Sequence, residues 1–157
     1  MKIIIGADHG GYKIKAKLVE RLQREGHQAK DAGTFSPEPC DYPKIGARVA
    51  QGVSQRKFDR GILICKSGIG LSIVANKFPR VRAALCHNAE QARLSREHND
   101  ANVLVLGAHQ VPEGQIPQVI ETWLATPFET GGRHERRVKQ IERIERKIFG
   151  NQKGGRK

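Results

Sequence analysis

Short apolar runs alternate with longer amphipathic segments along this chain. The apolar runs predict buried strands, because they are short and bounded by turn residues; they lie at residues 2–7, 61–65, 81–86 and 102–106, with a weaker run at 27–31. The segments between and after them predict helices, because apolar residues recur every three or four positions; these are residues 10–24, 45–53, 68–76, 89–96, 116–124 and 134–149. Strands separated by helices are typical of a parallel sheet covered on both faces. The pattern therefore predicts one doubly wound α/β domain over residues 1–150.

The end of the chain differs from the rest. Val138, Ile141, Ile144 and Ile148 form an apolar stripe on a helix that is otherwise strongly charged. A long helix after the last strand has to bury this stripe somewhere, and we expect it to dock on a second subunit. Residues 151–157 are basic and rich in glycine, and we expect a disordered tail there.

The net charge of +12 calls for an anionic partner: nucleic acid, anionic lipid or a small anionic substrate. Much of the basic excess lies in one helix and the tail, and an aromatic content of 5% supplies few platforms for stacking bases. We therefore expect a small substrate and no nucleic acid. The apolar run at the N-terminus is too short for a signal peptide or a membrane span, so we expect no membrane partner.

Three cysteines, Cys40, Cys65 and Cys86, are spaced too widely for a disulfide framework or a zinc pair, which indicates a reducing, cytoplasmic setting. Cys65 ends a predicted strand and is followed by the glycine-rich turn Lys66-Ser67-Gly68-Ile69-Gly70. Free amides at such a turn suit a small oxyanion, and a thiol beside them can serve as a base or nucleophile. A buried structural cysteine is the alternative, which we favour for Cys40 and Cys86.

Further polar groups are candidates by position. Asp8 and His9 follow the first strand, where a carboxylate can orient a sugar hydroxyl and an imidazole can bind phosphate. His98 and Asn99 precede a strand, at the opposite end of the sheet, and are therefore either structural or part of a neighbouring subunit's site. Arg133 and Arg137 lie one helical turn apart and can hold a phosphate together, although a solvated charged face is the simpler explanation. The six histidines show no metal-ligand spacing, so we expect no metal and no cofactor.

Motifs from nearly the whole chain occur together in a specific order. They are Gly6-Ala7-Asp8-His9-Gly10-Gly11, Asp41-Tyr42-Pro43, residues 61–77, Leu94-Ser95-Arg96-Glu97-His98-Asn99-Asp100 with Asn102-Val103-Leu104, and Gly131-Gly132-Arg133-His134 with Arg137. In order and spacing they resemble the B-type ribose-5-phosphate isomerase family, which includes galactose-6-phosphate isomerase subunits. The resemblance implies a Rossmann-like α/β/α fold and a homodimer or tetramer whose active sites are shared between subunits.

The resemblance also implies residue roles. Cys65 would be the catalytic base of the cysteine type, helped by Ser67, and His98 would open the furanose ring. Asp8 and Asn99 would hold sugar oxygens, and the amides of Lys66, Ser67, Gly68, Ile69 and Gly70 would form an anion hole. The phosphate would be held by His9, Arg133 and Arg137.

Two positions depart from the family pattern. Lys66 stands where the family usually has glycine, and His109 stands where it usually has arginine. The sequence thus predicts metal-independent interconversion of ribose 5-phosphate and ribulose 5-phosphate through a cis-enediolate. The departures keep open an isomerase of a 6-phosphohexose, such as allose or galactose 6-phosphate, and a non-catalytic sugar-phosphate or nucleic-acid-binding relative.

Overall fold

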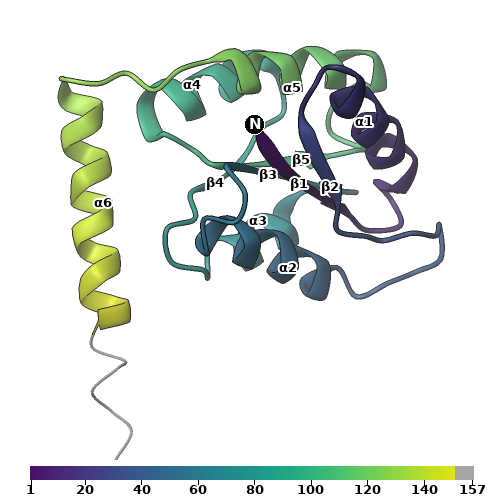
Figure 1. The fold of residues 1–157 in the computed structure, drawn as a ribbon, viewed down its shortest axis with the longest axis horizontal. Helices are drawn as coiled ribbons and strands as arrows, with labels where there is room; N and C mark the ends of the chain where they lie inside the picture. Colours follow the sequence, from purple (N-terminus) through teal and green to yellow (C-terminus); the bar gives the residue numbers. More distant parts are fainter. Residues whose placement is uncertain (151–157) are drawn as a thin grey trace, which may run out of the picture.

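A computed structural model describes residues 1–150, and its centre is a five-stranded parallel sheet in the order β2-β1-β3-β5-β4 (Figure 1). All four strand pairings are parallel, as the buried apolar runs predicted. The strands are β1 Lys2–Ala7, β2 Gln28–Asp31, β3 Arg60–Cys65, β4 Ala83–Leu85 and β5 Val103–Gly107.

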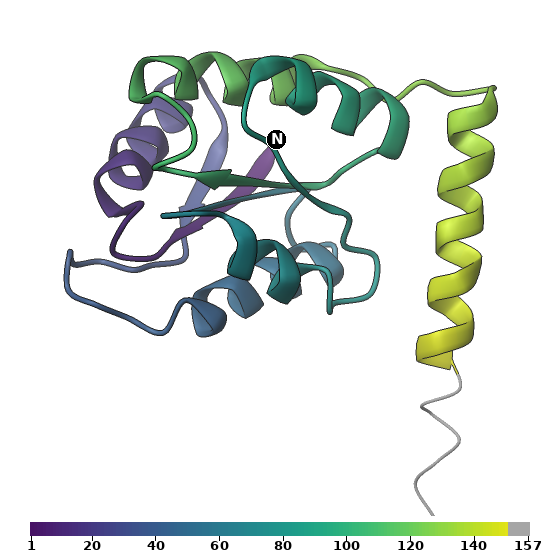
Figure 2. The same ribbon diagram turned by 180° about the vertical axis from the view of Figure 1, so that it is seen from behind.

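Helices cover both faces of the sheet, which confirms the predicted α/β/α sandwich. They are α1 Tyr12–Arg24, α2 Tyr42–Ser54, α3 Ile69–Ala75, α4 Ala89–Asn99, α5 Ile116–Ala125 and α6 Arg133–Gly150, with a 3-10 turn at Glu113–Gln115. In Figures 1 and 2, α1, α4 and α5 lie on one face, and α2 and α3 lie on the other. Each strand therefore contributes alternate side chains to two separate cores.

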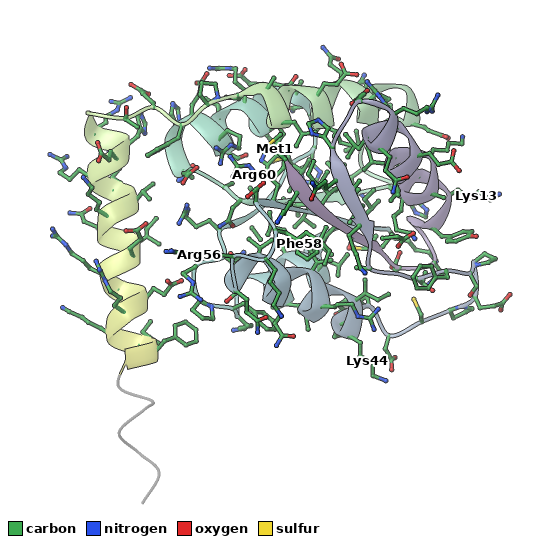
Figure 3. All side chains as sticks on the ribbon, viewed as in Figure 1. Met1, Lys13, Lys44, Arg56, Phe58 and Arg60 are labelled. Carbon is green, nitrogen blue, oxygen red and sulfur yellow. The ribbon has the colours of Figure 1, made fainter. Side chains whose placement is uncertain are left out.

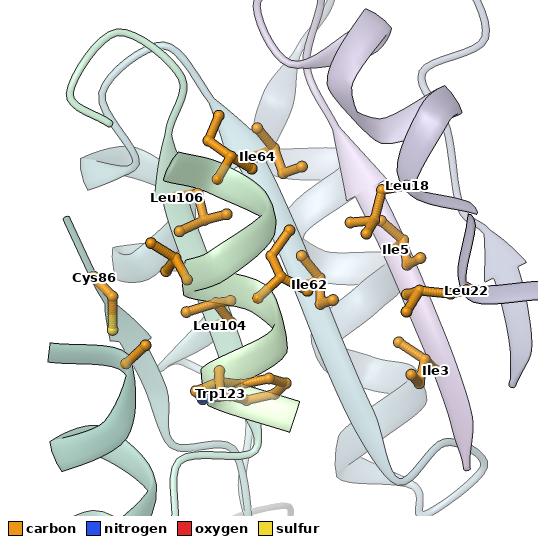
Figure 4. Packing of buried hydrophobic residues seen from close by; sticks show 14 of the residues in the cluster. Ile3, Ile5, Leu18, Leu22, Ile62, Ile64, Cys86, Leu104, Leu106 and Trp123 are labelled. Carbon is orange, nitrogen blue, oxygen red and sulfur yellow. The ribbon is translucent and has the colours of Figure 1, made fainter. Parts of the chain in front are cut away.

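The larger core lies under α1, α4 and α5. In Figure 4, Ile5 of β1, Ile62 of β3 and Leu104 of β5 point to this side, and they belong to one core with Trp123 of α5, which is fully buried. The intervening residues of the same strands, among them Leu63, face α2 and α3. Cys65 belongs to this second core, so its thiol points toward the α2 and α3 side of the sheet.

The strand order reverses direction at one place. From β1 the chain moves outward to β2 and then returns to place β3 on the other side of β1. In such sheets the crevice at the carboxyl ends of the two strands flanking the reversal is the usual ligand site. Here that crevice lies between the residues after Ala7 and the residues after Cys65.

Helix α6 stands apart from the sandwich, beyond the edge where β4 lies (Figures 1 and 2). It contacts α4 of the sandwich. Two of its glutamates also contact the loop before β4: Glu145 accepts the backbone N–H of Arg80 at 2.7 Å, and Glu142 lies 3.8 Å from the Arg82 guanidinium. None of the helices within residues 1–150 is long and apolar enough to cross a membrane.

The predicted elements are all present, but several boundaries were wrong. The first helix begins at Tyr12 rather than at Gly10, because Gly10 and Gly11 form a turn whose N–H groups donate to the carboxylate of Asp8. The strand predicted at 81–86 is only Ala83–Leu85, at the edge of the sheet. The helix predicted to stop at Arg96 continues to Asn99 and ends where Asp100 adopts a left-handed conformation with φ of 47°. The tail predicted at 151–157 lies outside the described residues.

Candidate active site

The turn after β3 forms the centre of the candidate site. Gly68 caps α3 with φ of +80°, a left-handed conformation that favours glycine, and it turns the chain sharply back toward the strand end. Its N–H donates to Sγ of Cys65 at 3.0 Å. The Ser67 hydroxyl accepts the N–H of Ile69 at 3.3 Å, so Ser67 also lies within this turn.

Two opposing influences act on the thiol of Cys65, which is 5% exposed. Burial raises its pKa because it disfavours the charged thiolate, and the nearby carboxylate of Asp8 raises it further. The hydrogen bond from Gly68 lowers the pKa, but the balance lies above the ordinary value. The thiol is therefore mainly protonated in the free protein at neutral pH.

Asp8 lies across the crevice from this turn, at the end of β1. It is 7% exposed, and its Oδ1 accepts the N–H of Gly10 at 2.8 Å and that of Gly11 at 3.1 Å. The backbone N–H of Asp8 donates to the carbonyl of Ile64, which fixes the first turn against β3. His9 follows it, and its Nδ1 is buried with no hydrogen-bond partner in the described chain. This imidazole nitrogen is available to a ligand.

Lys66 connects the two turns. A Cβ built on Gly10 would lie 2.5 Å from Cγ of Lys66 and 3.2 Å from Oδ1 of Asp8, so the lysine side chain crosses directly over Gly10. The residue at the other family departure lies beside it, because the N–H of His109 donates to the carbonyl of Lys66 at 3.0 Å. The two departures are thus neighbours at the mouth of one crevice, although they are far apart in the sequence.

Tyr42 is a site residue that sequence reasoning quoted without giving it a role. It begins α2, and its ring atoms lie 2.6 Å from the position that a Cβ on Gly70 would occupy. The ring therefore covers the first turn of α3, and glycine at position 70 makes room for it. An aromatic residue immediately before a proline at a helix start, with a glycine-rich turn elsewhere, was the only sequence signal.

The structure places His98 in a second group, between the end of α4 and the start of α6. The His98 and His134 rings stack with centroids 3.9 Å apart and planes 5° from parallel. Burial lowers the pKa of His134, and the neighbouring His98 lowers it further. Glu129 Oε2 lies 3.7 Å from Nε2 of His134, and Nε of Arg133 donates to the same nitrogen at 3.2 Å.

This second group contains three side chains of metal-ligand type. One ligand atom from each of His98, Glu129 and His134 lies within 4.8 Å of the others, a cluster that spacing along the sequence did not indicate. Imidazole lone pairs lie in the plane of the ring, and the two ring planes are stacked and nearly parallel, so the lone pairs do not converge on one point. At least one ring would have to turn for both histidines to bind the same ion.

The predicted site residues fall at opposite ends of the sheet. The pairing of β3 with β5 runs from Gly61 beside Val103 to Cys65 beside Gly107. Cys65 is therefore at the carboxyl ends of the strands, whereas His98 and Asn99, which lead into β5, are at the amino ends. Arg133 and Arg137 are on the first turns of α6, near His98. A single chain brings the predicted residues together only as two half-sites.

The chemical capacity of the two half-sites differs. The first holds a thiol, a buried carboxylate and backbone amides of the Gly68 turn around one crevice, and these groups can move a proton and stabilise an oxyanion. The second holds imidazoles and guanidinium groups near the surface, and these can transfer a proton at a ring oxygen or bind a phosphate.

Comparison with known proteins shows which family the chain belongs to. The ribose/galactose isomerase family matches residues 3–141. Ribose-5-phosphate isomerase B of Escherichia coli is 42% identical over 146 residues, which cover 93% of this chain and 97% of that protein. The structure of Clostridium thermocellum ribose-5-phosphate isomerase B superposes with a TM-score of 0.90 at 48% identity and covers 94% of this chain and 99% of its own.

The Mycoplasma genitalium ribose-5-phosphate isomerase B structure, which contains bound ribulose 5-phosphate, has a TM-score of 0.87 at 36% identity and covers 92% of this chain and 96% of its own. These matches extend over both half-sites. The chain belongs to the ribose/galactose isomerase family.

Proposed function

We propose that this protein interconverts ribose 5-phosphate and ribulose 5-phosphate. The observation that carries the proposal is the Cys65 thiol held against the amide-lined turn at Gly68, at the point where the strand order reverses. Proton transfer between C1 and C2 of a sugar needs one base beside the carbon atoms and donors beside the developing oxyanion. Relatives at about 40% identity over most of the chain are named ribose-5-phosphate isomerase B.

Cys65 acts as the base in this proposal. As a thiolate it removes the C2 proton of the open-chain aldose and returns it to C1, through a cis-enediolate. The amides of residues 66–70 and the Ser67 hydroxyl stabilise the negative charge, and removal of one such donor typically costs about 3 kcal/mol. A positioned base contributes roughly 10²–10⁴-fold to the rate. The low exposure of Cys65 and Asp8 strengthens the charge stabilisation, because water screens charge less beside buried groups.

The remaining residues bind the substrate. Asp8 holds sugar hydroxyls, as does Asn99, and His98 transfers the proton that opens the furanose ring. His9, Arg133 and Arg137 bind the phosphate, and the unpartnered buried Nδ1 of His9 supports its part in this. Lys66 adds a cation at the mouth of the crevice.

A second copy of the chain completes the site. Cys65 and His98 lie at opposite ends of one sheet, so they can act on one substrate only if each comes from a different subunit. The exposed side chains of Ile141, Ile144 and Ile148 on α6 support such docking, since they are 45%, 59% and 55% exposed in the single chain. Arg133 and Arg137 lie on the same side of the helix as the isoleucines. With 3.6 residues per turn, each arginine is separated from each isoleucine by close to a whole number of turns.

Two exposed isoleucines on α3 indicate the surface of the partner subunit on which α6 docks. Ile69 and Ile73 on α3 are 57% and 56% exposed, and Ile69 directly follows the Gly68 turn. Apolar contact between α6 of one subunit and α3 of the other brings Arg137 close to the partner's crevice. Such an isologous pairing forms two equal sites in a homodimer.

Incubation with ribose 5-phosphate in D₂O tests the proposed reaction. We expect NMR to show ribulose 5-phosphate carrying deuterium at C1, because the proton taken up by the thiol exchanges with solvent before a proton is returned to C1. Conversion without deuterium would contradict proton exchange with solvent at the base. Saturable shifts of the substrate signals without conversion would instead indicate a sugar-phosphate binder.

A 6-phosphohexose is the second candidate substrate. Lys66 and His109 favour it, because both residues that depart from the family pattern meet at the crevice mouth and change the space and charge there. Parallel assays with allose 6-phosphate and galactose 6-phosphate decide between the substrates. A higher kcat/KM for either hexose would reassign the substrate but keep the reaction type.

A further inference from the structure

Helix α6 presents three distinct faces, of which one packs on the body and one is used by the proposed function. The inner face carries the residues that the body covers or half-covers; these are His134, Glu135, Val138, Glu142, Glu145 and Phe149. The second face carries Ile141, Ile144 and Ile148 with Arg137. All three acids of the helix lie on or beside the inner face, where Glu142 and Glu145 contact the body. Glu142 and Glu145 are therefore turned away from the opposite side of the helix.

The third face is basic. With 3.6 residues per turn, its members fall within about 100° of arc; they are Arg136, Lys139, Arg143, Arg146 and Lys147. All five are exposed. Lys139 pairs with Glu135, but within residues 1–150 no carboxylate lies within ion-pair distance of Arg136, Arg143 or Lys147. Figure 3 shows nitrogen-tipped side chains projecting from α6 on the side away from the sandwich.

The composition of this face distinguishes among anionic partners. Stable anchoring to a membrane surface takes apolar side chains that enter the lipid in addition to cations, and a stable protein interface takes buried aromatic or aliphatic anchors. The basic face contains neither kind of residue. Binding to a phosphate backbone requires only cations that displace condensed counterions. The cations recur at each helical turn, over about 16 Å of helix length, which suits a row of phosphates.

We propose that the basic face of α6 binds the phosphate backbone of nucleic acid without sequence preference. The composition alone had argued against such a partner, because the cations were concentrated in one helix and aromatic residues were few. The structure reverses the first argument, because these cations share one exposed face on which, within residues 1–150, only Lys139 is paired with a carboxylate. The second argument concerns stacking on single strands, which a duplex backbone does not require.

The face remains accessible in the proposed homodimer. The isoleucine face and the basic face lie on different sides of α6, so docking of a second subunit on the isoleucines leaves Arg136, Arg143 and Lys147 exposed. None of these three residues has a role in the proposed isomerisation. Nucleic-acid binding is thus independent of whether the proposed sugar reaction is correct.

Fluorescence anisotropy of a labelled 20-base-pair duplex, titrated with the full chain at several salt concentrations, tests the inference. We expect a micromolar Kd at about 50 mM salt, with log K falling linearly with log salt concentration. The variant R136E/R143E/K147E should lose at least about tenfold in affinity and reduce the magnitude of the salt slope by about three. Circular dichroism verifies that the variant is folded.

A matched variant controls for net charge. Lys13, Lys30 and Lys44 are exposed and lie on the sandwich, away from α6 (Lys13 and Lys44 are labelled in Figure 3). The variant K13E/K30E/K44E removes the same charge and should keep the affinity within about twofold. Equal losses in the two variants, or no binding by the unaltered protein, would overturn the proposal. Binding to vesicles of anionic phospholipid without binding to the duplex would assign the face to a membrane instead.

Discussion

The two ends of the sheet differ in how completely one chain builds them. At the carboxyl ends, Asp8 and Cys65 are nearly buried, and both accept hydrogen bonds from neighbouring backbone amides. At the amino ends, Arg133 and Arg137 are exposed, and the His98 ring stacks on the ring of His134. The first region is organised before substrate arrives, whereas the second has groups that face outward.

This difference indicates a division of labour. Chemistry on carbon needs a base and oxyanion donors fixed to within fractions of an ångström, and parallel strand ends and the helix start hold the first half-site that rigidly. Phosphate binding tolerates more freedom, because a guanidinium group can reach an anion from several positions. A surface group delivered by a second subunit is adequate for binding but would be a poor location for the base.

The largest expected effect concerns the base. Cys65→Ala should lower kcat by about 10²–10⁴-fold, since a positioned base contributes that much, while the fold is retained. Coupled spectroscopic assays of ketose formation measure it. Cys86→Ala is the matched control, because Cys86 is an equally buried cysteine just beyond the end of β4, and it should remain active. Near-normal turnover by Cys65→Ala would show that the Cys65 thiol is not the base.

Mixing two inactive variants tests whether the half-sites combine across subunits. Cys65→Ala and His98→Asn chains that exchange subunits should regain about a quarter of normal activity, because half of the dimers are mixed and each has one intact site of two. The variants are denatured, mixed and refolded before assay. Refolding each variant alone supplies the control. If the mixture remains inactive although mixed dimers form, the shared site is refuted.

Phosphate binding should respond more modestly. Arg137→Ala is expected to raise KM for ribose 5-phosphate by about 10–100-fold, the usual loss for a hydrogen-bonded ion pair with a charged group. Arg136→Ala is the matched control, since Arg136 adjoins Arg137 but lies on a different face of α6. Steady-state kinetics on both variants should change only for Arg137. An unchanged KM would show that Arg137 does not bind the phosphate.

The last expected effect is on pH dependence. Burial and Asp8 raise the pKa of the Cys65 thiol, so the thiolate fraction of the free protein is small at neutral pH and grows with pH. We expect kcat/KM to rise between about pH 7 and 9, by at most about tenfold per pH unit. A profile that is flat over this range would show that the thiol ionises at lower pH than its surroundings indicate.

The first half-site was largely predictable from sequence. The apolar run ending in Cys65, the glycines after it and the Asp8 turn after β1 are contiguous in the chain, and strand ends in a parallel sheet meet at one edge. The sequence did not reveal Tyr42 over Gly70, because that contact joins α2 to α3 and depends on how the two helices pack. Nor did it place Lys66 beside His109.

The sequence by itself determined the sandwich, because hydrophobic periodicity directly reflects which side of each element is buried. It also determined the list of candidate site residues, through motifs whose order resembles one family. Only the tertiary structure decided which groups meet. It stacked His98 on His134, separated both from Cys65 by the length of the sheet, and turned the acids of α6 toward the body while its basic face stayed exposed. Such arrangements depend on the direction in which each element leaves the sheet, and local residue patterns do not encode that direction.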